Sequence, residues 1–461
     1  MLFKIAFRNI LRNGRRSAMT LLAIAVGSSA VVLFGEFVAF IRAGLETNAV
    51  QNVGHFTVFR TGYFDYGAGN PAAFGIEGYE NVIRLIQGDP EVGPTLNVVT
   101  PTVALSGIAG NFDIDASKTF LGAGYVPADR EHMRRWDEHG VSRHRANEDP
   151  ALRDDDETIG VVGVGLARVL GLCAPLKIPN CPPRPVTPTP ATVAASADLP
   201  SLSAEDIAPG NHGDAPRLDL LTATASGAPN VMSLHVTRAE PQSARELDEN
   251  VVIMHFALAQ KLLYGRGERQ AVGIIVQLHR TEDLARVRAR LAALFAAHHL
   301  DLEIRDFADR EPFYRQAVGM FSAIFLFIAL IMGVIVLFTV VNTMGMSVVE
   351  RTNEIGTARA MGLQRAGVRR LFVLEGTLLG AFGASVGVSL GQVIAVLFNH
   401  TGAMWTPPGQ AAPSPLEVLT SGMQPLLIGA WLLLMVIATL AAVVPANRAA
   451  RLKVVDALRH V

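Results

Sequence analysis

A charge-free stretch in the second half of the chain reads QAVGMFSAIFLFIALIMGVIVLFTVVNTMGMSVV, residues 316–349. A helix needs about 20 apolar residues to cross the hydrocarbon core of a bilayer. The apolar part of this stretch exceeds that length, and a segment in hydrocarbon must be helical so that its backbone groups pair internally. The stretch therefore predicts a transmembrane helix, which we place at residues 318–342.

Three further apolar stretches predict spans at residues 17–41, 371–398 and 425–444. Half of the 461 residues are hydrophobic and 18% are charged, against about 25% charged in soluble domains. The net charge of −1 argues against a strongly basic nucleic-acid-binding protein. The first stretch is longer than the apolar region of roughly 7–15 residues in a cleaved signal peptide, so we expect a retained helix.

Basic residues predict the orientation of the four spans. Residues 1–17, the loop 343–370 and the tail 445–461 together hold fourteen Lys and Arg, whereas the loop 399–424 holds none. Cytoplasmic flanks of membrane helices carry the excess of Lys and Arg. We therefore expect both termini and the loop 343–370 in the cytoplasm, with the loop 399–424 and residues 42–317 on the outer side.

Residues 1–16 have the pattern of an amphipathic helix. Lys4, Arg8, Arg12 and Arg15 recur at helical spacing. This predicts a helix in the cytoplasmic interface, with its basic groups toward anionic lipid heads. A plain basic flank is the alternative.

Residues 42–317 are too long for a loop and predict a folded outer domain. The segment has strand-like pieces at residues 54–60, 96–108, 251–254 and 271–278. A helix over residues 281–298 is predicted with Thr281 as its N-cap and with Val287, Leu291 and Phe295 on one face. Strands followed by a capped helix are typical of an α+β domain.

Residues 174–216 hold ten of the 25 prolines. Proline fixes φ and lacks a donor, so we expect a flexible insertion here. The two cysteines, Cys173 and Cys181, lie at its start. On an oxidising outer side they could close a small disulfide loop, and two free thiols are the alternative.

We predict no catalytic, cofactor-binding or metal-binding residues. None of the five lysines follows a glycine, so the chain lacks a phosphate-binding P-loop. The run Gly163-Val164-Gly165 lacks the third glycine of a dinucleotide site, and we interpret it as a strand-to-helix turn. His132 and His139 do not have the spacing of a zinc helix, so a solvated surface is favoured.

The loop 343–370 contains the segment VERTNEIGTARAMG, residues 349–362. It predicts a short amphipathic helix over residues 348–362, with an apolar edge of Ile355, Ala358 and Met361. A short helix exposed between two spans is suited to a groove on a partner. A simple interfacial turn is the alternative.

This segment resembles the coupling region of the FtsX-like permeases, whose pattern is approximately E-R-x-x-E-I-G-x-x-R-A-[LM]-G. The family includes lipoprotein-releasing permeases, macrolide-exporter permeases and the division-linked permease. Residues 6–13, 163–172 and 247–263 are also similar to segments of the family, the last two to the lipoprotein-releasing members, which the chain resembles most. The residues that the resemblance assigns to ATPase coupling are Glu350, Arg351, Glu354, Ile355, Gly356, Arg359, Ala360, Met361 and Gly362.

The resemblance implies a type VII ABC permease, an α-helical membrane protein with four transmembrane helices and a large α+β extracytoplasmic domain. That domain would have a porter-like part (about residues 42–112 and 250–317) and a sabre-like part (about 113–249). The resemblance also implies a bacterial inner membrane, a second permease copy or paralogue, a periplasmic carrier or adaptor, and a cytoplasmic ABC ATPase dimer that binds ATP and Mg. The missing P-loop favours an ATPase on a separate chain.

The third span carries a row of small residues that permit close helix packing. Packing within the chain and contact between two permeases remain open for this row. Glu36 and Glu375 lie near span ends, where carboxylates are candidates for function and an interfacial role is favoured. The glycines of the row are Gly376, Gly380, Gly383, Gly387 and Gly391.

The leading functional hypothesis is a non-catalytic permease that passes ATPase motion to the outer domain, which moves or releases a lipoprotein, lipid or other hydrophobic cargo. An efflux permease and a signalling scaffold acting on a cell-wall hydrolase are alternatives. A membrane-anchored enzyme or receptor would leave the coupling segment unexplained. The cargo rests on analogy alone.

Overall fold

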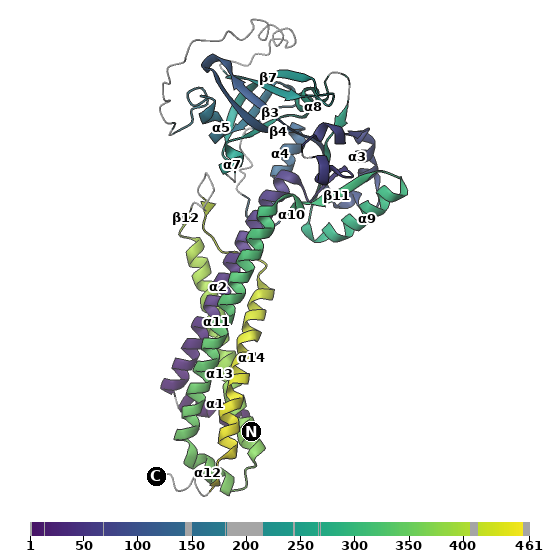
Figure 1. Ribbon diagram of the computed structural model, residues 1–461. Coiled ribbons are helices and arrows are strands. Elements are labelled where there is room, and N and C mark those ends of the chain that lie inside the picture. Colours follow the sequence, from purple (N-terminus) through teal and green to yellow (C-terminus); the bar gives the residue numbers. More distant parts are fainter. Residues whose placement is uncertain are drawn as a thin grey trace. The chain divides into compact units, whose positions relative to one another are not determined.

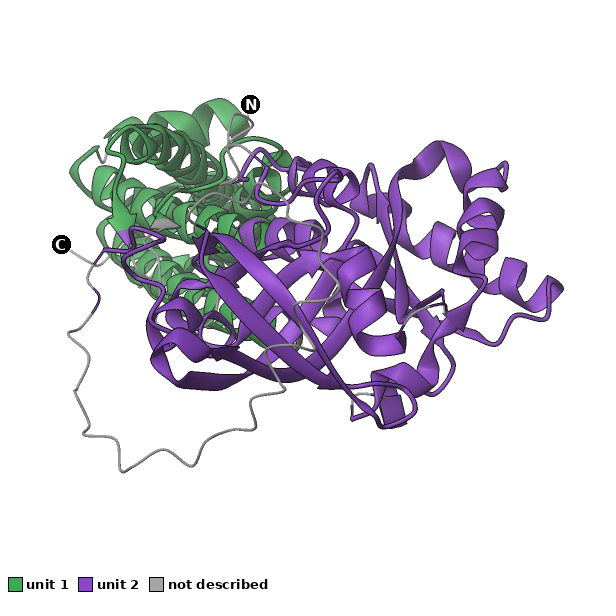
Figure 2. Cartoon of the chain, turned by 90° about the horizontal axis from the view of Figure 1, so that it is seen from above, with its two compact units in different colours: residues 1–43, 316–404, 415–461 green, residues 44–315, 405–414 purple. Residues whose placement is uncertain are grey.

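The computed structural model describes residues 2–12, 14–67, 69–142, 150–179, 181, 215–242, 245–265, 267, 269–405 and 414–454. The chain divides into two compact units (Figure 2). Unit 1 comprises residues 1–43, 316–404 and 415–461, and unit 2 comprises residues 44–315 and 405–414. The division separates the predicted spans from most of the predicted outer domain.

Unit 1 is built from helices (Figure 1). Among the residues that the structure describes, four helices are long and apolar enough to cross a membrane, and each of the four predicted spans lies inside one. These four are α2 (Gly14–Val53), α11 (Pro312–Glu350), α13 (Arg365–Asn399) and α14 (Gln424–Arg451). The unit also contains α1 (Leu2–Arg12) and α12 (Thr352–Ala360), and β12 (Met404–Trp405) pairs with β13 (Ser414–Pro415). The predicted fold class, four candidate spans with a large α/β domain, is confirmed.

The glycine row of α13 packs against two neighbouring helices of the same chain. All five glycines are buried. A Cβ on Gly380 would lie 2.7 Å from Ala438 Cβ of α14, and one on Gly383 would lie 2.7 Å from Ile24 Cβ of α2. Gly376 likewise faces α14, whereas Gly387 and Gly391 face α2. The structure shows packing within the chain for this row, and contact between two permeases stays a prediction.

Unit 2 contains a nine-stranded sheet in the order β11-β1-β10-β3-β4-β8-β5-β7-β6. An additional pairing of β3 with β6 closes the ring β3-β4-β8-β5-β7-β6. The sheet includes strands from both the porter-like and the sabre-like ranges, so that division stays a prediction. The strands are β1 (Phe56–Arg60), β3 (Leu96–Asn111), β4 (Ala116–Tyr125), β5 (Ile159–Gly163), β6 (Arg217–Ala223), β7 (Pro229–Glu240), β8 (Val251–His255), β10 (Gly273–Leu278) and β11 (Leu302–Asp306).

Helices and short turns complete unit 2, and β2 (Ile76–Glu77) pairs with β9 (Gln270–Ala271). The core between sheet and helices includes Phe56, Phe120 and Leu234. The α-helices are α3 (Tyr79–Gly88), α4 (Pro127–Arg134), α5 (Val164–Val169), α7 (Arg245–Asp248), α8 (Phe256–Tyr264), α9 (Leu284–Ala297) and α10 (Phe307–Arg310). The shorter turns are η1 (Tyr63–Gly67), η2 (Pro71–Phe74), η3 (Gly93–Thr95), η4 (Phe112–Ile114) and η5 (Thr281–Asp283).

The predicted N-cap of the helix at residues 281–298 is wrong. Thr281–Asp283 form a 3-10 turn, and α9 begins at Leu284. The Thr281 hydroxyl lies 3.2 Å from His55 Nε2 instead of bonding to the helix N-terminus. The predicted apolar face is confirmed, because Val287, Leu291 and Phe295 are buried.

The run Gly163-Val164-Gly165 is a strand-to-helix turn, as predicted. Gly163 ends β5 and Val164 begins α5. The Asp248 carboxylate accepts hydrogen bonds from Val164 N at 3.1 Å and from Gly165 N at 2.8 Å. The first backbone amides of α5 are therefore hydrogen-bonded to a side chain of the same chain.

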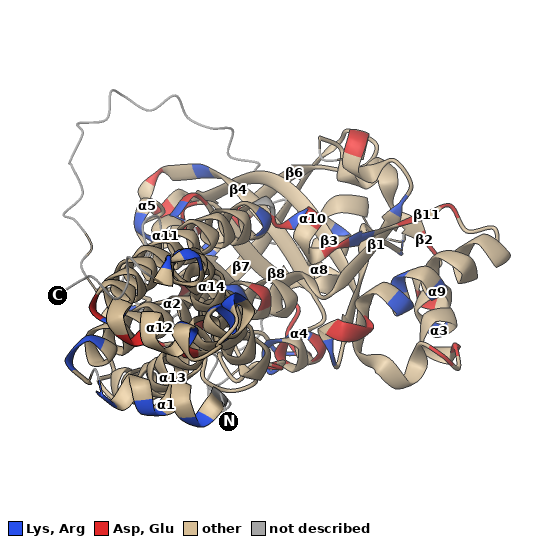
Figure 3. Cartoon of the chain, turned by 90° about the horizontal axis from the view of Figure 1, so that it is seen from below, with Lys and Arg blue, Asp and Glu red and all other residues tan. Residues whose placement is uncertain are grey.

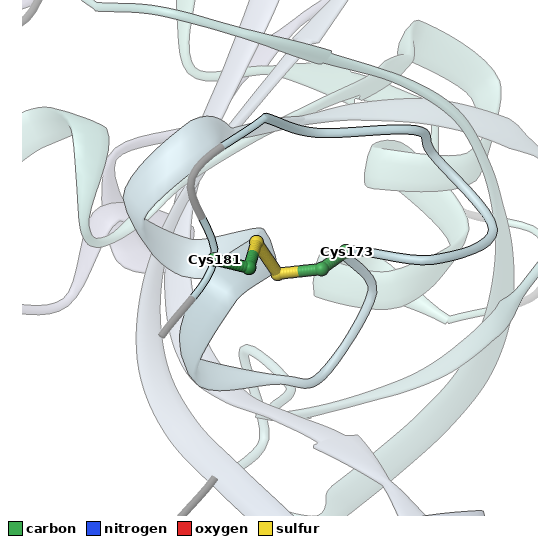
Figure 4. Close-up of a disulfide and its surroundings, with 2 residues drawn as sticks. All are labelled: Cys173 and Cys181. Atoms are coloured by element: carbon green, nitrogen blue, oxygen red, sulfur yellow. A yellow bond between two sulfur atoms is a disulfide. The ribbon is translucent and has the colours of Figure 1, made fainter. Parts of the chain in front are cut away.

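Cys173 and Cys181 form a disulfide, with a Cα–Cα distance of 6.3 Å (Figure 4). Most of the proline-rich stretch 174–216 lies outside the described residues. His132 is exposed, whereas His139 Nε2 lies 3.4 Å from Glu46 Oε1. Among the described residues, no group of three or more His, Cys, Asp or Glu could hold a metal ion.

Candidate functional site

The candidate site is the end of unit 1 where α1, α12 and the neighbouring ends of α2, α11, α13 and α14 meet. Figure 3 shows Lys and Arg on α1 and on helix ends near α12. The side chains of Arg12 and Arg16 pair with Glu354 and Glu350 across this end. The N-terminal segment and the loop 343–370, which the sequence assigns to one side of the membrane, are thus in direct contact.

A buried ion pair lies at the centre of the site. Arg351, between α11 and α12, donates from Nη1 to both carboxylate oxygens of Glu375 in α13, each at 3.1 Å. Only 9% of the Arg351 side chain and 5% of the Glu375 side chain are exposed. The guanidinium also lies over the ring of Phe372, 5.4 Å from its centroid. A buried charge pair is tolerated only when geometry and additional hydrogen bonds offset its desolvation.

Asn9 of α1 supplies an additional hydrogen bond. Its Nδ2 donates to Glu375 Oε1 at 2.6 Å, and the residue is buried. The Glu375 carboxylate therefore joins three segments that are far apart in the sequence: α1, the α11–α12 junction and α13.

A second, exposed layer surrounds this pair. Arg12 Nη2 donates to both oxygens of Glu354, at 2.7 and 2.6 Å, and Arg351 Nε donates to Glu354 Oε2 at 3.3 Å. Burial opposes the charge on Glu354, but the hydrogen bonds from Arg12 and Arg351 outweigh it and hold the pKa of this carboxyl below its usual value. Exposed ion pairs stabilise a fold only weakly, so this layer orients side chains more than it holds the helices.

The predicted helix over residues 348–362 is divided in two. The second span continues as α11 to Glu350, and α12 begins at Thr352 after a break at Arg351. Glu350 therefore lies on the spanning helix rather than on the short one. The break places Arg351 where its side chain turns inward to Glu375.

The buried face of α12 also differs from the predicted apolar edge. Thr352, Ile355 and Gly356 are buried, whereas Met361 is 78% exposed. The predicted edge is wrong at Met361 because α12 ends at Ala360, and Gly362 then adopts a positive φ of 101°. From Thr352 to Gly362 the exposed residues are Asn353, Glu354, Thr357, Ala360, Met361 and Gly362.

The matched family residues thus divide into two groups. Arg351, Ile355 and Gly356 are buried in the chain, and Arg359 Nη1 donates to the carbonyl oxygen of Leu452. Glu350, Glu354, Ala360, Met361 and Gly362 are exposed. The structure brings these residues to one place, and their role in ATPase coupling stays a prediction.

A small cavity of about 30 Å³ lies beside the buried pair. Asn9, Arg16, Ser17, Ser347 and Glu375 are among its lining residues. A cavity of this size has room for water, although most of its lining surface is apolar. The carboxylate of Glu375 therefore borders a small, mostly apolar pocket within the helix bundle.

Sequence reasoning missed the contributions of Asn9 and Arg12 to this site. It placed Arg12 on a lipid-facing basic stripe, and it treated Glu375 as a membrane carboxylate for which an interfacial role was favoured. The pairs Asn9–Glu375 and Arg12–Glu354 are separated by 366 and 342 residues. One sequence offers no signal that joins positions so far apart.

Glu36 lies in a separate contact within unit 1. Its Oε1 accepts a hydrogen bond from Gln392 Nε2 of α13, and its backbone oxygen accepts from Leu419 N at 3.2 Å. The carboxylate is buried between α2 and α13. This position is compatible with helix packing and does not test an interfacial role.

Residues 324–454 match the FtsX-like permease C-terminal family. This range contains α12, α13, α14 and most of α11. These matches support a permease of the FtsX/MacB type. The predicted resemblance is confirmed at this level.

Similar proteins include permeases from bacteria and an archaeon. The permease is 30% identical over 196 residues to the macrolide export ATP-binding/permease protein MacB of Neisseria gonorrhoeae, covering 42% of this chain and 28% of that protein. It is 29% identical over 135 residues to the protein of the same name in Escherichia coli, covering 29% and 21%. It is 26% identical over 159 residues to an uncharacterised ABC transporter permease of Methanocaldococcus jannaschii, covering 33% and 39%. The alignments thus span between 21% and 39% of the relatives' own length.

Proposed function

We propose that this permease couples ATP hydrolysis by a separate ABC ATPase to the movement or release of a hydrophobic cargo on the outer side of a bacterial inner membrane. Permeases of this type work with an ABC ATPase partner. The main support for the proposal comes from α12. This short helix has an exposed face and is fixed to the spanning helices by a buried ion pair. A partner that pushes on this face transfers force to α13.

Within this proposal the ATPase binds ATP and Mg, and the permease supplies no catalytic group. Both termini and the loop 343–370 lie in the cytoplasm, where the ATPase docks. The basic groups of α1 and α12 support this orientation through the positive-inside rule. Exposed Phe3, Phe7 and Leu11 on α1 support contact of that helix with lipid.

For the cargo, we propose a lipoprotein or lipid, on the resemblance of residues 163–172 and 247–263 to lipoprotein-releasing permeases. Efflux of a small hydrophobic compound is the second candidate, because the Neisseria and Escherichia relatives are named for macrolide export. A second permease copy and a periplasmic carrier or adaptor complete either assembly. Transmission of ATPase motion to a cell-wall hydrolase, without cargo, is the third outcome to test.

The test is purification of tagged permease from native membranes in detergent, with mass-spectrometric identification of any ABC ATPase and measurement of its activity. Thr357→Trp adds bulk to the exposed face of α12, and Thr401→Trp is the matched control on an exposed residue beyond α13. We expect Thr357→Trp to lower the recovery of the ATPase by about tenfold and Thr401→Trp to leave it unchanged. Equal recovery with both variants would overturn α12 as the docking site, and recovery of a cell-wall hydrolase in place of cargo would favour signalling.

A further inference from the structure

We propose that Glu375 is a positioning residue that fixes α12 and α1 to α13, so that the three helices move as one body when the ATPase acts. This inference rests on the proposed function. It assigns Arg351 a role inside the permease, although the family pattern places that residue in the ATPase-coupling segment. It also makes the N-terminal helix a part of the coupling apparatus.

Buried hydrogen bonds join Glu375 to Asn9 and Arg351. Its carboxylate accepts one hydrogen bond from Asn9 and two from Arg351, at 2.6, 3.1 and 3.1 Å. All three side chains are at least nine-tenths buried. Separating Arg351 from Glu375 would leave two buried charges without partners, which is far more costly than breaking an exposed pair.

Helix α1 packs against α13. Ala6 is fully buried, and the ring of Phe7 lies 6.2 Å from that of Phe382 in α13. Asn9 lies on the same side of α1 as Ala6, about one helical turn further along. The N-terminal helix is thus held to α13 by apolar contacts and by the hydrogen bond to Glu375.

The break between α11 and α12 affects how force could pass from α12 to the spanning helices. Because Arg351 lies at this break, no continuous helix transmits force from α12 into α11. The bond from Arg351 to Glu375 offers a direct route into α13 instead. From α13, close glycine contacts lead to α14 at Gly376 and to α2 at Gly383.

The experiment measures the mobility of α12 with a spin label on Thr357→Cys, an exposed position, while the Cys173–Cys181 disulfide stays intact. A second label on Thr401→Cys reports general loosening of the bundle. The variants are Glu375→Ala, Arg351→Ala and the double variant, with Glu417→Ala as a control carboxylate outside the site. ATPase stimulation by the full complex is measured in parallel.

We expect each single variant to mobilise the label at position 357 and to lower ATPase stimulation by about tenfold, while the label at 401 stays unchanged. The double variant should be no worse than either single variant, because both remove the same link. A label at 357 that stays immobile, a label at 401 that loosens equally, or fully additive effects would each overturn the proposal. The Thr357→Trp test of docking is separate. If Thr357→Trp does not lower ATPase recovery while Glu375→Ala still mobilises α12, the role of Glu375 is supported and α12 is not the docking site.

Discussion

Gly387 of α13 lies so close to Ser28 of α2 that a Cβ at position 387 would overlap the serine hydroxyl. The backbone of α2 is also close, because Ala25 O and Ala25 Cα lie within 3 Å of that Cβ position. At the same place, two serines of α2 donate hydrogen bonds to α13. Ser29 Oγ donates to Gly387 O at 2.7 Å, and Ser28 Oγ donates to Ala384 O at 3.2 Å. This crossing holds the first span to the third.

The Gly387→Val variant is predicted to loosen this crossing. Backbone atoms cannot rotate away as a side chain can, so we expect a loss of about 1–3 kcal/mol or more, typical of overpacking. Thermal unfolding in detergent measures the loss. Gly345→Ala is the matched control, since nothing lies within 4 Å of a Cβ there. An unchanged melting temperature for Gly387→Val would contradict the close crossing.

Gln277 of β10 is the subject of the second prediction. Its buried amide donates to Val50 O at the end of α2 and to Met133 O at the end of α4, each at 3.1 Å, and accepts from Asn97 Nδ2 at 2.7 Å. Gln277→Leu leaves these groups without the amide and is expected to cost about 1–3 kcal/mol. Thermal unfolding of the full chain checks this, with Gln87→Leu on the exposed side of α3 as the control. Equal stability of the two variants would show that the amide contributes little.

The third prediction concerns pH. Burial lowers the pKa of His55 to about 4, and Glu46 opposes this only in part. Its Nδ1 accepts a hydrogen bond from Leu278 N at 3.0 Å, so the neutral ring has its proton on Nε2. Since the folded pKa is below the unfolded value of about 6.5, the unfolded state binds more protons as pH falls. The contribution to stability is full near pH 7 and is lost between about pH 6.5 and 4.

We expect wild type to lose about 2 kcal/mol more stability than His55→Asn between pH 7 and pH 5. The asparagine Oδ1 can still accept from Leu278 N but does not titrate. Trp136, whose ring centroid lies 5.1 Å from that of His55, reports unfolding by fluorescence. His139, whose pKa is raised by its hydrogen bond to Glu46 against the effect of burial, contributes with the opposite sign in both proteins and cancels in the comparison. Parallel pH profiles would show that His55 does not titrate as expected.

Local sequence patterns predicted the long apolar helices well, because a bilayer requires an apolar spanning segment to be helical. Apolar runs longer than the bilayer must become helices, and the four runs did. The strand-like stretches at residues 54–60, 96–108 and 271–278 likewise contain β1, most of β3 and β10. Errors arose where a side chain had a better tertiary partner, as for Thr281 beside His55.

The candidate site was predicted in part. The segment 349–362 pointed to the correct end of the bundle, but helical periodicity could not place the break at Arg351. At that break Arg351 contacts Glu375, which lies 24 residues further along the chain, and Glu375 in turn contacts Asn9, 366 residues before it. The sequence also did not predict the pairing of β3 with β6, since hydrophobic patterns do not specify which distant strands pair.

The disulfide gives the last prediction. Cys173 and Cys181 enclose a sequence separation of eight residues directly after α5, next to the buried Leu170 and Leu172. Cross-linking over a loop of this size stabilises a fold by roughly 2–3 kcal/mol through the entropy of the unfolded chain. We expect the double variant Cys173→Ser/Cys181→Ser to lose about that amount, measured by chemical unfolding of the full chain in detergent. Wild type in reductant should unfold like the double variant, and the double variant itself should not respond to reductant. If reductant leaves wild type unchanged while mass spectrometry shows both thiols free, the bond does not stabilise the domain, and its role is limited to linking the two positions.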